Sequence, residues 1–434
     1  MTGHLISRIK ARIAVVGVVG LGYVGLPLVK AFAAGGLRCV GFDVDPMKVR
    51  KLLAGESYIK HIARAAIAEQ VGAGRLRAST DFGETAQAEA VIICVPTPLN
   101  KFREPDISYV LNTGRALAPH LQRGTLVVLE STTYPGTTDE DLRQVLEQGS
   151  GLKAGVDFHL AFSPEREDPG NPASKVALIP KVVGGYTPSC LARAIALYGQ
   201  AIERIVPVSS CRVAEATKLL ENIFRSVNIA LVNELKVVYS AMGIDIWEVI
   251  DAAKTKPFGF MPFYPGPGLG GHCIPIDPFY LTWKAREFGQ HTRFIELAGE
   301  VNTAMPEYVV GRVVEALNDQ GKALRNARVL LLGLAYKANV DDDRESPSYV
   351  LMEKLEAKGA QVSYNDPNVP VIRPSREHGH LAGRKSAPLT GNYDLILIAT
   401  AHDEYKNFDF SHFTIPVVDS RNCVKARPKL YYQA

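Results

Sequence analysis

A strand–turn–helix near the amino terminus restricts the fold of this chain more than any other feature. The apolar run Ile13–Val19 leads into Gly20–Gly25 (GLGYVG), which is followed by a helical stretch, Leu26–Ala34. In this pattern the first glycine permits a tight turn, the second lets the backbone approach a pyrophosphate, and the third lets helix and strand pack closely. The amides at the helix N-terminus then face the phosphate charge. We therefore predict a dinucleotide-binding α/β domain.

The second predicted strand, Cys39–Asp43, supplies the acid that such a domain needs. Asp43 ends this strand at about the offset where dinucleotide-binding folds place a carboxylate on the adenosine ribose. An acid at this position would repel a 2′-phosphate, which favours NAD over NADP. Asp45 competes for the same role, but Asp43 lies closer to the end of the strand.

Strand-like apolar runs alternate with helical stretches in both terminal parts of the chain. This alternation is typical of parallel sheets covered by helices on both faces. We predict an α/β fold with two Rossmann-like, doubly wound parallel-sheet domains, at residues 1–208 and 319–434, the second being smaller. The strands predicted in the two domains are Ile13–Val19, Cys39–Asp43, Val91–Val95 and Leu126–Glu130 in the first, and Arg328–Leu334, Gln361–Asn365, Tyr393–Thr400 and Ile415–Asp419 in the second.

The middle of the chain, residues 209–318, has a different texture. Arg212 to about Met242 contains no glycine or proline and reads as one long helix. A Gly/Pro-rich loop follows, and a second helix is predicted from about Phe294 to Leu317. We predict a helical connector and a cleft between the two nucleotide-type domains, since ligand sites prefer such interfaces. The alternative is one cofactor domain with an oligomerisation domain.

Composition excludes several classes of protein. The formal charge of +4, from 49 basic and 45 acidic residues, argues against a nucleic-acid-binding surface. No secretory signal is visible, and no apolar run approaches the roughly 20 residues that span a bilayer. The six cysteines are scattered, with no CxxC pair and no zinc spacing, so we expect reduced thiols and no metal. These features predict a soluble, cytoplasmic protein.

Cys273 lies in the Gly/Pro-rich loop Pro265–Pro278. A buried cysteine is usually only a small hydrophobic residue. Here, however, glycines let the backbone approach a ligand, and His272 and Asp277 add polar groups. A nearby cation such as Lys218 would help to form a thiolate. Because a thiolate can capture the aldehyde that one hydride removal leaves, the loop suggests an alcohol oxidised twice, to a carboxylate, on one enzyme.

Polar residues on the long helix and in three loops are ambiguous in isolation. Lys218, Asn222 and Arg225 lie on one stripe of the helix, which is a solvated face in most proteins. The remaining circumference is unusually apolar, so the stripe could instead face a wet cavity. The runs 163–167 and 337–347 are typical of turns with helix caps, and Arg421 of an ordinary loop cation.

Taken together and in order, these motifs resemble the UDP-glucose/GDP-mannose dehydrogenase family over almost the whole chain. The ordered set is far more specific than any single member. The motifs that carry the resemblance are Gly20–Pro27, Cys94–Pro98, Glu130–Thr132, Ser163–Arg166, Lys218–Asn222, Gly270–Cys273 and Tyr336–Pro347.

Within that family the chain looks most like the bacterial enzymes of O-antigen and capsule synthesis that oxidise UDP-N-acetylglucosamine at C6. The runs Lys256–Phe260 through Trp283–Arg286 and Glu165–Gly170 carry this similarity. Family members that oxidise UDP-glucose commonly have a lysine directly before the aspartate of the cysteine loop. Ile276 occupies that position here, which supports the N-acetylhexosamine branch.

The resemblance implies roles for individual residues. The catalytic set would be Cys273 as nucleophile, Lys218 and Asn222 facing the oxyanion at C6, and Asp277, Glu165 and Thr132 ordering or activating the hydrolytic water. NAD would contact Gly20, Gly22, Tyr23, Val24, Gly25, Asp43, Lys48, Thr97, Thr132 and Arg344. The UDP-sugar would contact Glu165, Arg166, Glu167, Lys218, Asn222, Arg225, Gly268, Tyr336, Lys337 and Arg421.

The implied reaction is a four-electron, NAD-dependent oxidation of UDP-N-acetylglucosamine to its uronate through a thiohemiacetal and a thioester. UDP-N-acetylmannosamine, UDP-N-acetylgalactosamine and UDP-glucose are alternative substrates. A β-hydroxyacid-type dehydrogenase, which transfers one hydride without a cysteine, is a more distant alternative, and a nonenzymatic nucleotide sensor is another. The long apolar helix predicts a homodimer or a higher homo-oligomer.

Overall fold

The computed structural model describes residues 4–59, 62–100, 104–166, 177–271, 274–375 and 377–434. Three residues with predicted roles, Glu167, His272 and Cys273, lie outside these ranges. The chain forms two compact units. One comprises Met1–Glu221 with Phe279–Gln290, and the other comprises Asn222–Pro278 with His291–Ala434.

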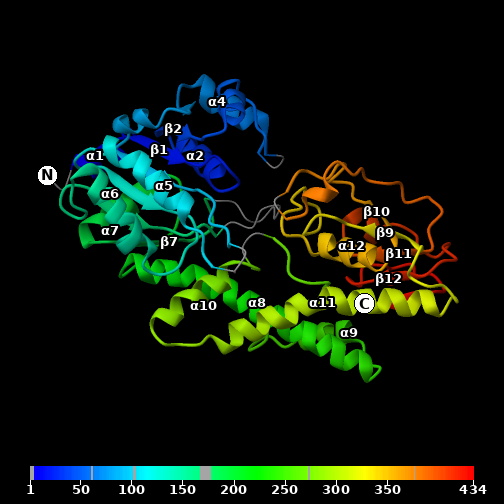
Figure 1. The fold of residues 1–434 in the computed structure, drawn as a ribbon. Coiled ribbons are helices and arrows are strands. Elements are labelled where there is room, and N and C mark those ends of the chain that lie inside the picture. The colour runs from blue at the N-terminus through cyan, green and yellow to red at the C-terminus, as the bar shows by residue number, and fades with distance from the viewer. Residues whose placement is uncertain (1–3, 60–61, 101–103, 167–176, 272–273, 376) are drawn as a thin grey trace. The chain divides into compact units, whose positions relative to one another are not determined.

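The first unit is built on a sheet of eight strands in the order β3-β2-β1-β4-β5-β6-β7-β8 (Figure 1). All neighbouring strands are parallel except β6 and β7, which pair antiparallel. The predicted parallel sheet is therefore present, with a reversal at one end. The strands are β1 Val15–Val19, β2 Arg38–Phe42, β3 Leu76–Ser79, β4 Ala90–Ile93, β5 Leu126–Leu129, β6 His159–Phe162, β7 Lys181–Gly185 and β8 Ile205–Val208.

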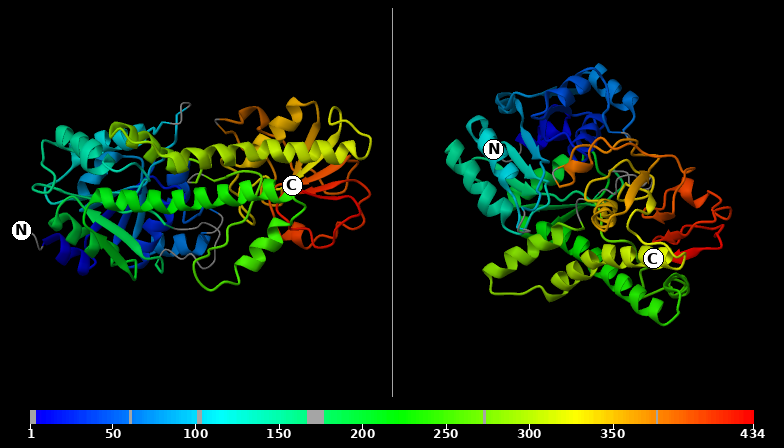
Figure 2. Two further views of the ribbon diagram at one scale, coloured as in Figure 1. Left: turned by 90° about the horizontal axis from the view of Figure 1, so that it is seen from below. Right: turned by 45° about the vertical axis from the view of Figure 1, so that its right-hand side comes forward.

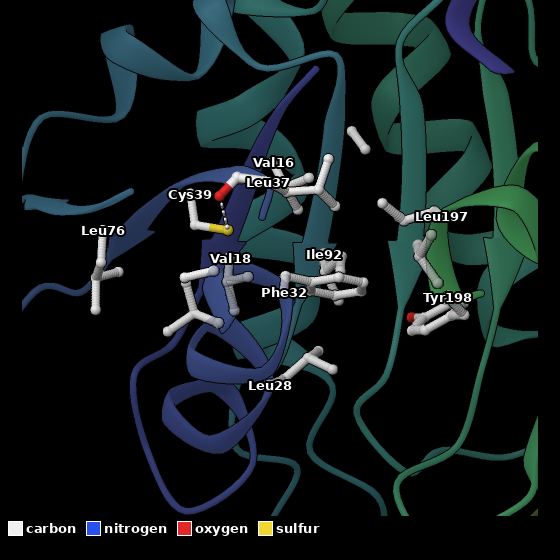
Figure 3. Close-up of a cluster of buried hydrophobic side chains, with 14 of the residues drawn as sticks. Val16, Val18, Leu28, Phe32, Leu37, Cys39, Leu76, Ile92, Leu197 and Tyr198 are labelled. Carbon is white, nitrogen blue, oxygen red and sulfur yellow. Dashed lines mark hydrogen bonds between the residues drawn. The ribbon is translucent and has the colours of Figure 1, made fainter. Parts of the chain in front are cut away.

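Helices bury both faces of this sheet. One core contains side chains of α1, α2 and α7, and the other contains side chains of α5 and α6. Figure 3 shows the first core, where Val18 and Ile92 of the strands lie near Phe32 of α2 and Tyr198 of α7. The helical segments are α1 His4–Lys10, α2 Gly25–Ala34, α3 Pro46–Leu53, α4 Arg64–Gly72, η1 Phe82–Gln87, α5 Ser108–Leu117, η2 Ala118–His120, the π-helical η3 Thr137–Leu142, α6 Arg143–Ser150, α7 Pro188–Tyr198 and α10 Asp277–Glu287.

The second unit contains a parallel sheet of five strands in the order β10-β9-β11-β12-β13. Successive residues of β9 alternate between two cores, with Val329 and Leu331 on one face and Leu330 and Leu332 on the other. This alternation is expected for a strand buried on both faces. The strands are β9 Arg328–Leu332, β10 Gln361–Asn365, β11 Leu395–Ile398, β12 Val417–Asp419 and β13 Tyr431–Gln433.

Two long helices accompany this sheet. Helix α8, Cys211–Ala241, continues from the first unit into the second, and α11, Arg293–Asn318, lies beside its C-terminal half (Figure 2). The amide of Asn302 on α11 accepts a hydrogen bond from Asn233 and donates one to the Ser226 carbonyl, both on α8. The remaining helical segments are α9 Ile246–Ala253, α12 Pro347–Ala357, η4 Gly379–Leu381 and α13 Asp403–Lys406. None of the described helices is both long and apolar enough to cross a bilayer.

Each sheet has a switch point where strand order reverses, between β1 and β4 in the first and between β9 and β11 in the second. Ligands of open α/β sheets bind outside the carboxyl ends of the strands at such points. Gly20 follows β1, and Gly333 follows β9. The two turns that begin at these glycines are therefore the first places to search for ligand-binding groups.

Candidate active site

The turn after β1 has the backbone geometry that a dinucleotide requires. Gly20 has φ +89°, and a Cβ there would lie 2.4 Å from the Cys94 carbonyl oxygen. A Cβ on Gly25 would lie 1.9 Å from the Gly20 carbonyl oxygen, so a side chain is excluded at both positions. A Cβ on Gly22 would meet nothing within 4 Å. The middle glycine thus faces open space at the start of α2, which fits a pyrophosphate group.

Asp43 is the acid of this turn. Its carboxylate is buried and accepts hydrogen bonds from the backbone amides of Leu21 and Asp45, each at 2.9 Å. It also forms an ion pair with the Lys48 ammonium at 3.0 Å. The competing Asp45 accepts from Met47 N and caps helix α3. The structure therefore brings Asp43 and Lys48 together beside the glycine turn, and it gives Asp45 a capping role.

Thr97 and Thr132, two predicted NAD contacts, also meet in the first unit. The Thr97 hydroxyl donates to the Thr132 carbonyl at 2.8 Å. The hydroxyl of Ser131 pairs with both backbone groups of Val95, at 3.0 and 2.7 Å. The loops after β4 and β5 are thereby joined at the carboxyl edge of the sheet. The Tyr280 hydroxyl on α10 donates to the Thr97 carbonyl and anchors that helix to the same edge.

Glu165 lies in a buried cluster that the sequence did not predict. The Lys181 ammonium lies 3.0 Å from Glu130 Oε2 and 3.3 Å from Glu165 Oε2. Tyr198 donates its hydroxyl proton to the other oxygen of Glu130. Burial alone would lower the pKa of Lys181, but the two carboxylates raise it above its ordinary value, so the ammonium stays charged. Burial raises the pKa of Glu130, although Lys181 and Tyr198 act in the opposite direction.

One sequence signal could have indicated this cluster. Glu130 directly precedes the Ser131-Thr132 motif, at the end of a strand whose other side chains are apolar. Lys181 begins β7, a strand that is not among those predicted from the sequence. Because β7 runs antiparallel to β6, its first residue lies at the edge where β5 and β6 end.

Arg166 connects this region to helix α8. Its guanidinium forms an ion pair with Glu221, 2.6 Å from Oε1, and donates to the Pro180 carbonyl at 2.7 Å. The Arg166 side chain is half-buried, with 27% of its surface exposed. Arg166 therefore contacts the last residue of α8 that belongs to the first unit, Glu221.

The three polar residues of the α8 stripe differ in how deeply they are buried. Lys218 and Asn222 are buried, whereas Arg225 is exposed. Asn222 donates its amide hydrogen to Asp277 Oδ2 at 2.6 Å, and Asp277 is also buried. The solvated-face interpretation is thus wrong for the first two residues and correct for Arg225. Asn222 and Asp277 join the helix stripe to the end of the cysteine loop.

Glu215 holds the first turns of α8 against the loop that follows Thr132. Its buried carboxylate accepts from the amides of Gly136 and Thr138, at 2.8 and 2.9 Å, and from the Thr138 hydroxyl. Burial raises the pKa of Glu215 to about 8, against the lowering effect of these bonds. The contact fixes the helix that carries Lys218 relative to Thr132, within the first unit.

The described part of the cysteine loop is held by polar groups of the second unit. Gly266 donates its amide hydrogen to Asn233 Oδ1 at 2.9 Å, which ties the loop to α8. A Cβ on Gly266 would lie 2.2 Å from Arg421 Nη1, so only glycine allows the guanidinium to pack there. Burial lowers the pKa of Arg421 to about 10, and its Nε donates to the Ala399 carbonyl. Arg421 is therefore not an ordinary loop cation.

Tyr336 packs against the same loop. A Cβ on Gly270 would lie 2.8 Å from Tyr336 Cβ, and one on Gly271 would lie 2.8 Å from the Tyr336 ring. Gly268, at φ +137°, lies against Pro347. The structure thus gathers Gly268, Tyr336 and Arg421, three predicted sugar-nucleotide contacts, around one glycine-rich loop, with Lys337 next to Tyr336 in the chain.

Arg344 and the cysteines complete the set of predicted residues. Arg344 makes a bidentate contact with Asp342 in the second unit, with nitrogen–oxygen distances of 2.8 and 2.7 Å.

Burial raises the pKa of four cysteine thiols, which makes them poor nucleophiles. These are Cys39, Cys94, Cys211 and Cys423.

Comparison with known protein families gives three successive matches along the chain. Residues 14–202 match the NAD binding domain of the UDP-glucose/GDP-mannose dehydrogenase family. Residues 212–304 match its central domain, and residues 330–426 match its UDP binding domain.

Individual relatives span nearly the whole chain. The chain is 39% identical to the UDP-N-acetyl-D-glucosamine 6-dehydrogenase of Pseudomonas aeruginosa, over 90% of this chain and 91% of that protein. It is 34% identical to the UDP-N-acetyl-D-mannosamine dehydrogenase of Pyrococcus horikoshii, over 95% and 96%. A solved structure of a UDP-D-ManNAc dehydrogenase from Pyrococcus horikoshii superposes with a TM-score of 0.87 at 32% identity, covering 96% of this chain and 98% of that one.

Proposed function

The chain belongs to the UDP-glucose/GDP-mannose dehydrogenase family, and we propose that it oxidises C6 of UDP-N-acetylglucosamine to the carboxylate in two NAD-dependent steps. The uronate would serve bacterial surface polysaccharide synthesis, as in O-antigen or capsule. The observation that carries the proposal is the buried hydrogen bond from Asn222 to Asp277, which unites the helix stripe with the cysteine loop.

Two observations favour the N-acetylglucosamine substrate. Of the relatives compared, the UDP-N-acetyl-D-glucosamine 6-dehydrogenase has the higher identity. Ile276 stands where UDP-glucose-oxidising members commonly have lysine, and it is buried. UDP-N-acetylmannosamine is the second candidate, because the mannosamine dehydrogenase matches a larger share of the chain.

NAD fits the turn after β1. The open space at Gly22 and the N-terminus of α2 would receive the pyrophosphate, and Asp43 with Lys48 would hold the adenosine ribose. Tyr23, Val24, Thr97, Thr132 and Arg344 would complete the contacts. When bound, NAD accepts the hydride that leaves C6.

The chemistry at C6 follows from a thiolate. The alcohol loses a hydride and a proton and becomes an aldehyde. The Cys273 thiolate adds to that carbon and forms a C–S bond, and loss of a second hydride and the hydroxyl proton leaves a thioester. Water adds to the thioester carbonyl, the C–S bond breaks, and the thiolate and a carboxylate are released. In total, one alcohol, two NAD⁺ and one water become one carboxylate, two NADH and three protons.

The chain's own polar groups stabilise the charges in these steps. Lys218 and Asn222 would donate to the oxyanion at C6, in an environment where burial strengthens each interaction. Among the described residues, no hydrogen bond or ion pair occupies the buried Lys218 ammonium. Glu165, Thr132 and Asp277 would order or activate the water.

The sugar nucleotide would be held mainly by groups of the second unit. The half-buried Arg421 lies against the glycine loop at Gly266, and the Tyr336 ring lies against it at Gly271, which suits a diphosphate and a base. Lys337 and Arg225 would add positive charge. Arg166, Glu167 and Glu165 would contact the sugar.

An exposed apolar stripe on α8 supports a homodimer. Leu220, Phe224, Leu231 and Val238 are 66%, 46%, 51% and 46% exposed, and they share one side of the helix. Lys218 and Asn222 lie on the opposite side. We also propose three domains, at 1–208, 209–318 and 319–434, the middle one carrying the dimer interface and the cysteine loop.

A panel of UDP-sugars with NAD tests the function. We expect the highest kcat/KM with UDP-N-acetylglucosamine and two NADH per sugar consumed, measured by absorbance and by chromatography of the uronate. Cys273→Ser should abolish uronate formation, because no thioester can form. Cys423→Ser, at a buried cysteine in the second unit, is the matched control and should leave the stoichiometry unchanged. Normal uronate output from Cys273→Ser would eliminate the mechanism.

A further inference from the structure

We propose that Lys181 is a positioning residue for thioester hydrolysis, because its ammonium holds the Glu165 carboxylate in place. The inference rests on the proposed function, in which Glu165 orders or activates the water. It adds a residue that neither the motifs nor the helix stripe indicates.

The reversal of β7 brings Lys181 to Glu165. Strands β5 and β6 end at Leu129 and Phe162, and β7 begins at Lys181 and pairs antiparallel with β6. The ammonium therefore lies at the carboxyl edge of the sheet, which is the edge where a parallel α/β sheet binds its ligands. A parallel β7 would have placed the same side chain at the opposite edge.

The two carboxylates that contact Lys181 differ in solvent exposure. The Glu130 side chain is 0% exposed, and the Lys181 side chain is 5% exposed. The Glu165 side chain is 16% exposed and lies 3.3 Å from the ammonium. Lys181 thus connects a sealed carboxylate to one that still reaches the surface of the first unit. Tyr198, which donates to Glu130, completes the inner side of the cluster.

This arrangement suits positioning rather than stability alone. Replacing a buried ion pair with apolar groups is often neutral for stability, so a lysine between two carboxylates is poorly explained by the fold. An ammonium that binds one oxygen of Glu165 fixes the direction of the other lone pairs. An ionised, oriented carboxylate can accept a proton from water as that water attacks a thioester.

The step that depends on Lys181 is therefore hydrolysis. The water oxygen forms a bond to the thioester carbonyl carbon, one water proton passes to Glu165, and the C–S bond breaks with its electron pair on sulfur. The carboxylic acid then loses its proton. Glu165 takes no proton in either oxidation step, so loss of Lys181 should leave the hydride transfers intact and delay release.

The test is a stopped-flow measurement of NADH with wild type and Lys181→Met. For the variant we expect a burst of two NADH per chain, followed by a steady-state rate at least about tenfold below wild type. The KM for NAD should stay within about twofold. Mass spectrometry of the variant, quenched after the burst, should show the uronyl group attached to the protein.

Because Lys181→Met leaves the buried Glu130 carboxylate without its cation, a second comparison uses two further variants. They are the single variant Glu130→Gln and the double variant Glu130→Gln with Lys181→Met. The glutamine keeps a partner for Tyr198 and removes the unpaired charge, so the double variant should fold. Of these two variants, only the double variant should show the burst of NADH. Tyr198→Phe is the matched control, since it deletes a contact to Glu130 but leaves both Lys181 contacts, and its kcat should stay within about twofold of wild type.

The outcomes are separable. If wild type yields no NADH with any UDP-N-acetylhexosamine, the proposed function is wrong. If wild type yields two NADH per sugar and the double variant turns over without a burst, at the rate of Glu130→Gln, only the role of Lys181 is wrong. Equal bursts in Glu130→Gln and in the double variant would assign the effect to Glu130 and would likewise overturn the inference.

Discussion

The turns after β1 and β9 share one backbone design. Gly20 and Gly333 both have φ +89°, and a Cβ on either would lie 2.4 Å from the chain that follows the next strand of the sheet. In both turns, the residue after the glycine donates its backbone amide hydrogen to the carboxylate of an aspartate. Leu21 N donates to Asp43 Oδ2 at 2.9 Å, and Leu334 N donates to Asp366 Oδ2 at 2.6 Å.

The two acids differ in what else they bind. Asp366 also accepts from the amides of Ala335, Asn368 and Val369, and from His402 Nε2 at 3.0 Å. Asn339 N donates to His402 Nδ1, which leaves the ring proton on the nitrogen that faces Asp366. The acid of the second turn is thereby saturated by the protein.

The helices behind the turns differ as well. Helix α2 begins at Gly25, directly after the first turn, so its N-terminal amides lie at the turn, where an anion could bind. In the second unit α12 begins only at Pro347, after an intervening loop. Where the first turn has the open Gly22, the second has Ala335, which is buried. A shared turn shape is therefore compatible with different ligands, and the free donors and acceptors decide which one binds.

The largest effect is expected from Gly25→Ala. Its Cβ would lie 1.9 Å from the Gly20 carbonyl, a backbone atom that cannot move without opening the turn. We expect a loss of more than about 4 kcal/mol in the free energy of unfolding of the first unit. Ala338→Gly, at the equivalent place after Gly333, should cost less than about 1 kcal/mol. Thermal unfolding checks both, and equal losses would show that the turns are equally constrained.

Asp366→Asn should follow in size. Burial raises the pKa of Asp366, but His402 and the backbone amides outweigh it and lower the pKa below its ordinary value. A lowered pKa contributes stability above about pH 4, and that stability is lost as the pH falls through the folded-state pKa. We expect a loss of about 2 kcal/mol at pH 7 that shrinks towards pH 3. A loss that stays constant between pH 7 and pH 3 would refute this account.

Asp43→Ala should act mainly on ligand binding. The carboxylate accepts fewer protein donors than Asp366 does, so the fold depends on it less. We expect the Kd for NAD to rise at least about tenfold, which corresponds to about 1.4 kcal/mol, while the Kd for UDP stays unchanged. Titration calorimetry measures both. An unchanged Kd for NAD would move the ribose contact to another residue.

Much of the fold could be predicted from local patterns. The predicted long helix from Arg212 to about Met242 is α8, and the predicted strand Gln361–Asn365 coincides with β10, because glycine, proline and apolar periodicity mark such boundaries. The antiparallel β7 could not be predicted, since strand direction depends on contacts between segments that are distant in the chain. That reversal is what hides Lys181 from sequence reasoning.

The candidate site divides in the same way. Motif order indicated Asp43 and Asn222, whose local context is distinctive. It did not indicate that Asn222 bonds Asp277, that Glu215 anchors α8, or that Asp366 is saturated, because each depends on burial and on partners far along the chain.

The most direct test of the central claim, that the first turn binds NAD and the second does not, is a calorimetric titration of Gly22→Ala with NAD and, separately, with UDP. The added methyl meets no protein atom within 4 Å, so the protein should fold normally and the methyl should occupy the space intended for the pyrophosphate. We predict one NAD per chain in wild type, a Kd for NAD at least about tenfold higher in the variant, and an unchanged Kd for UDP. An unchanged Kd for NAD, or equal weakening of both ligands, would contradict the account.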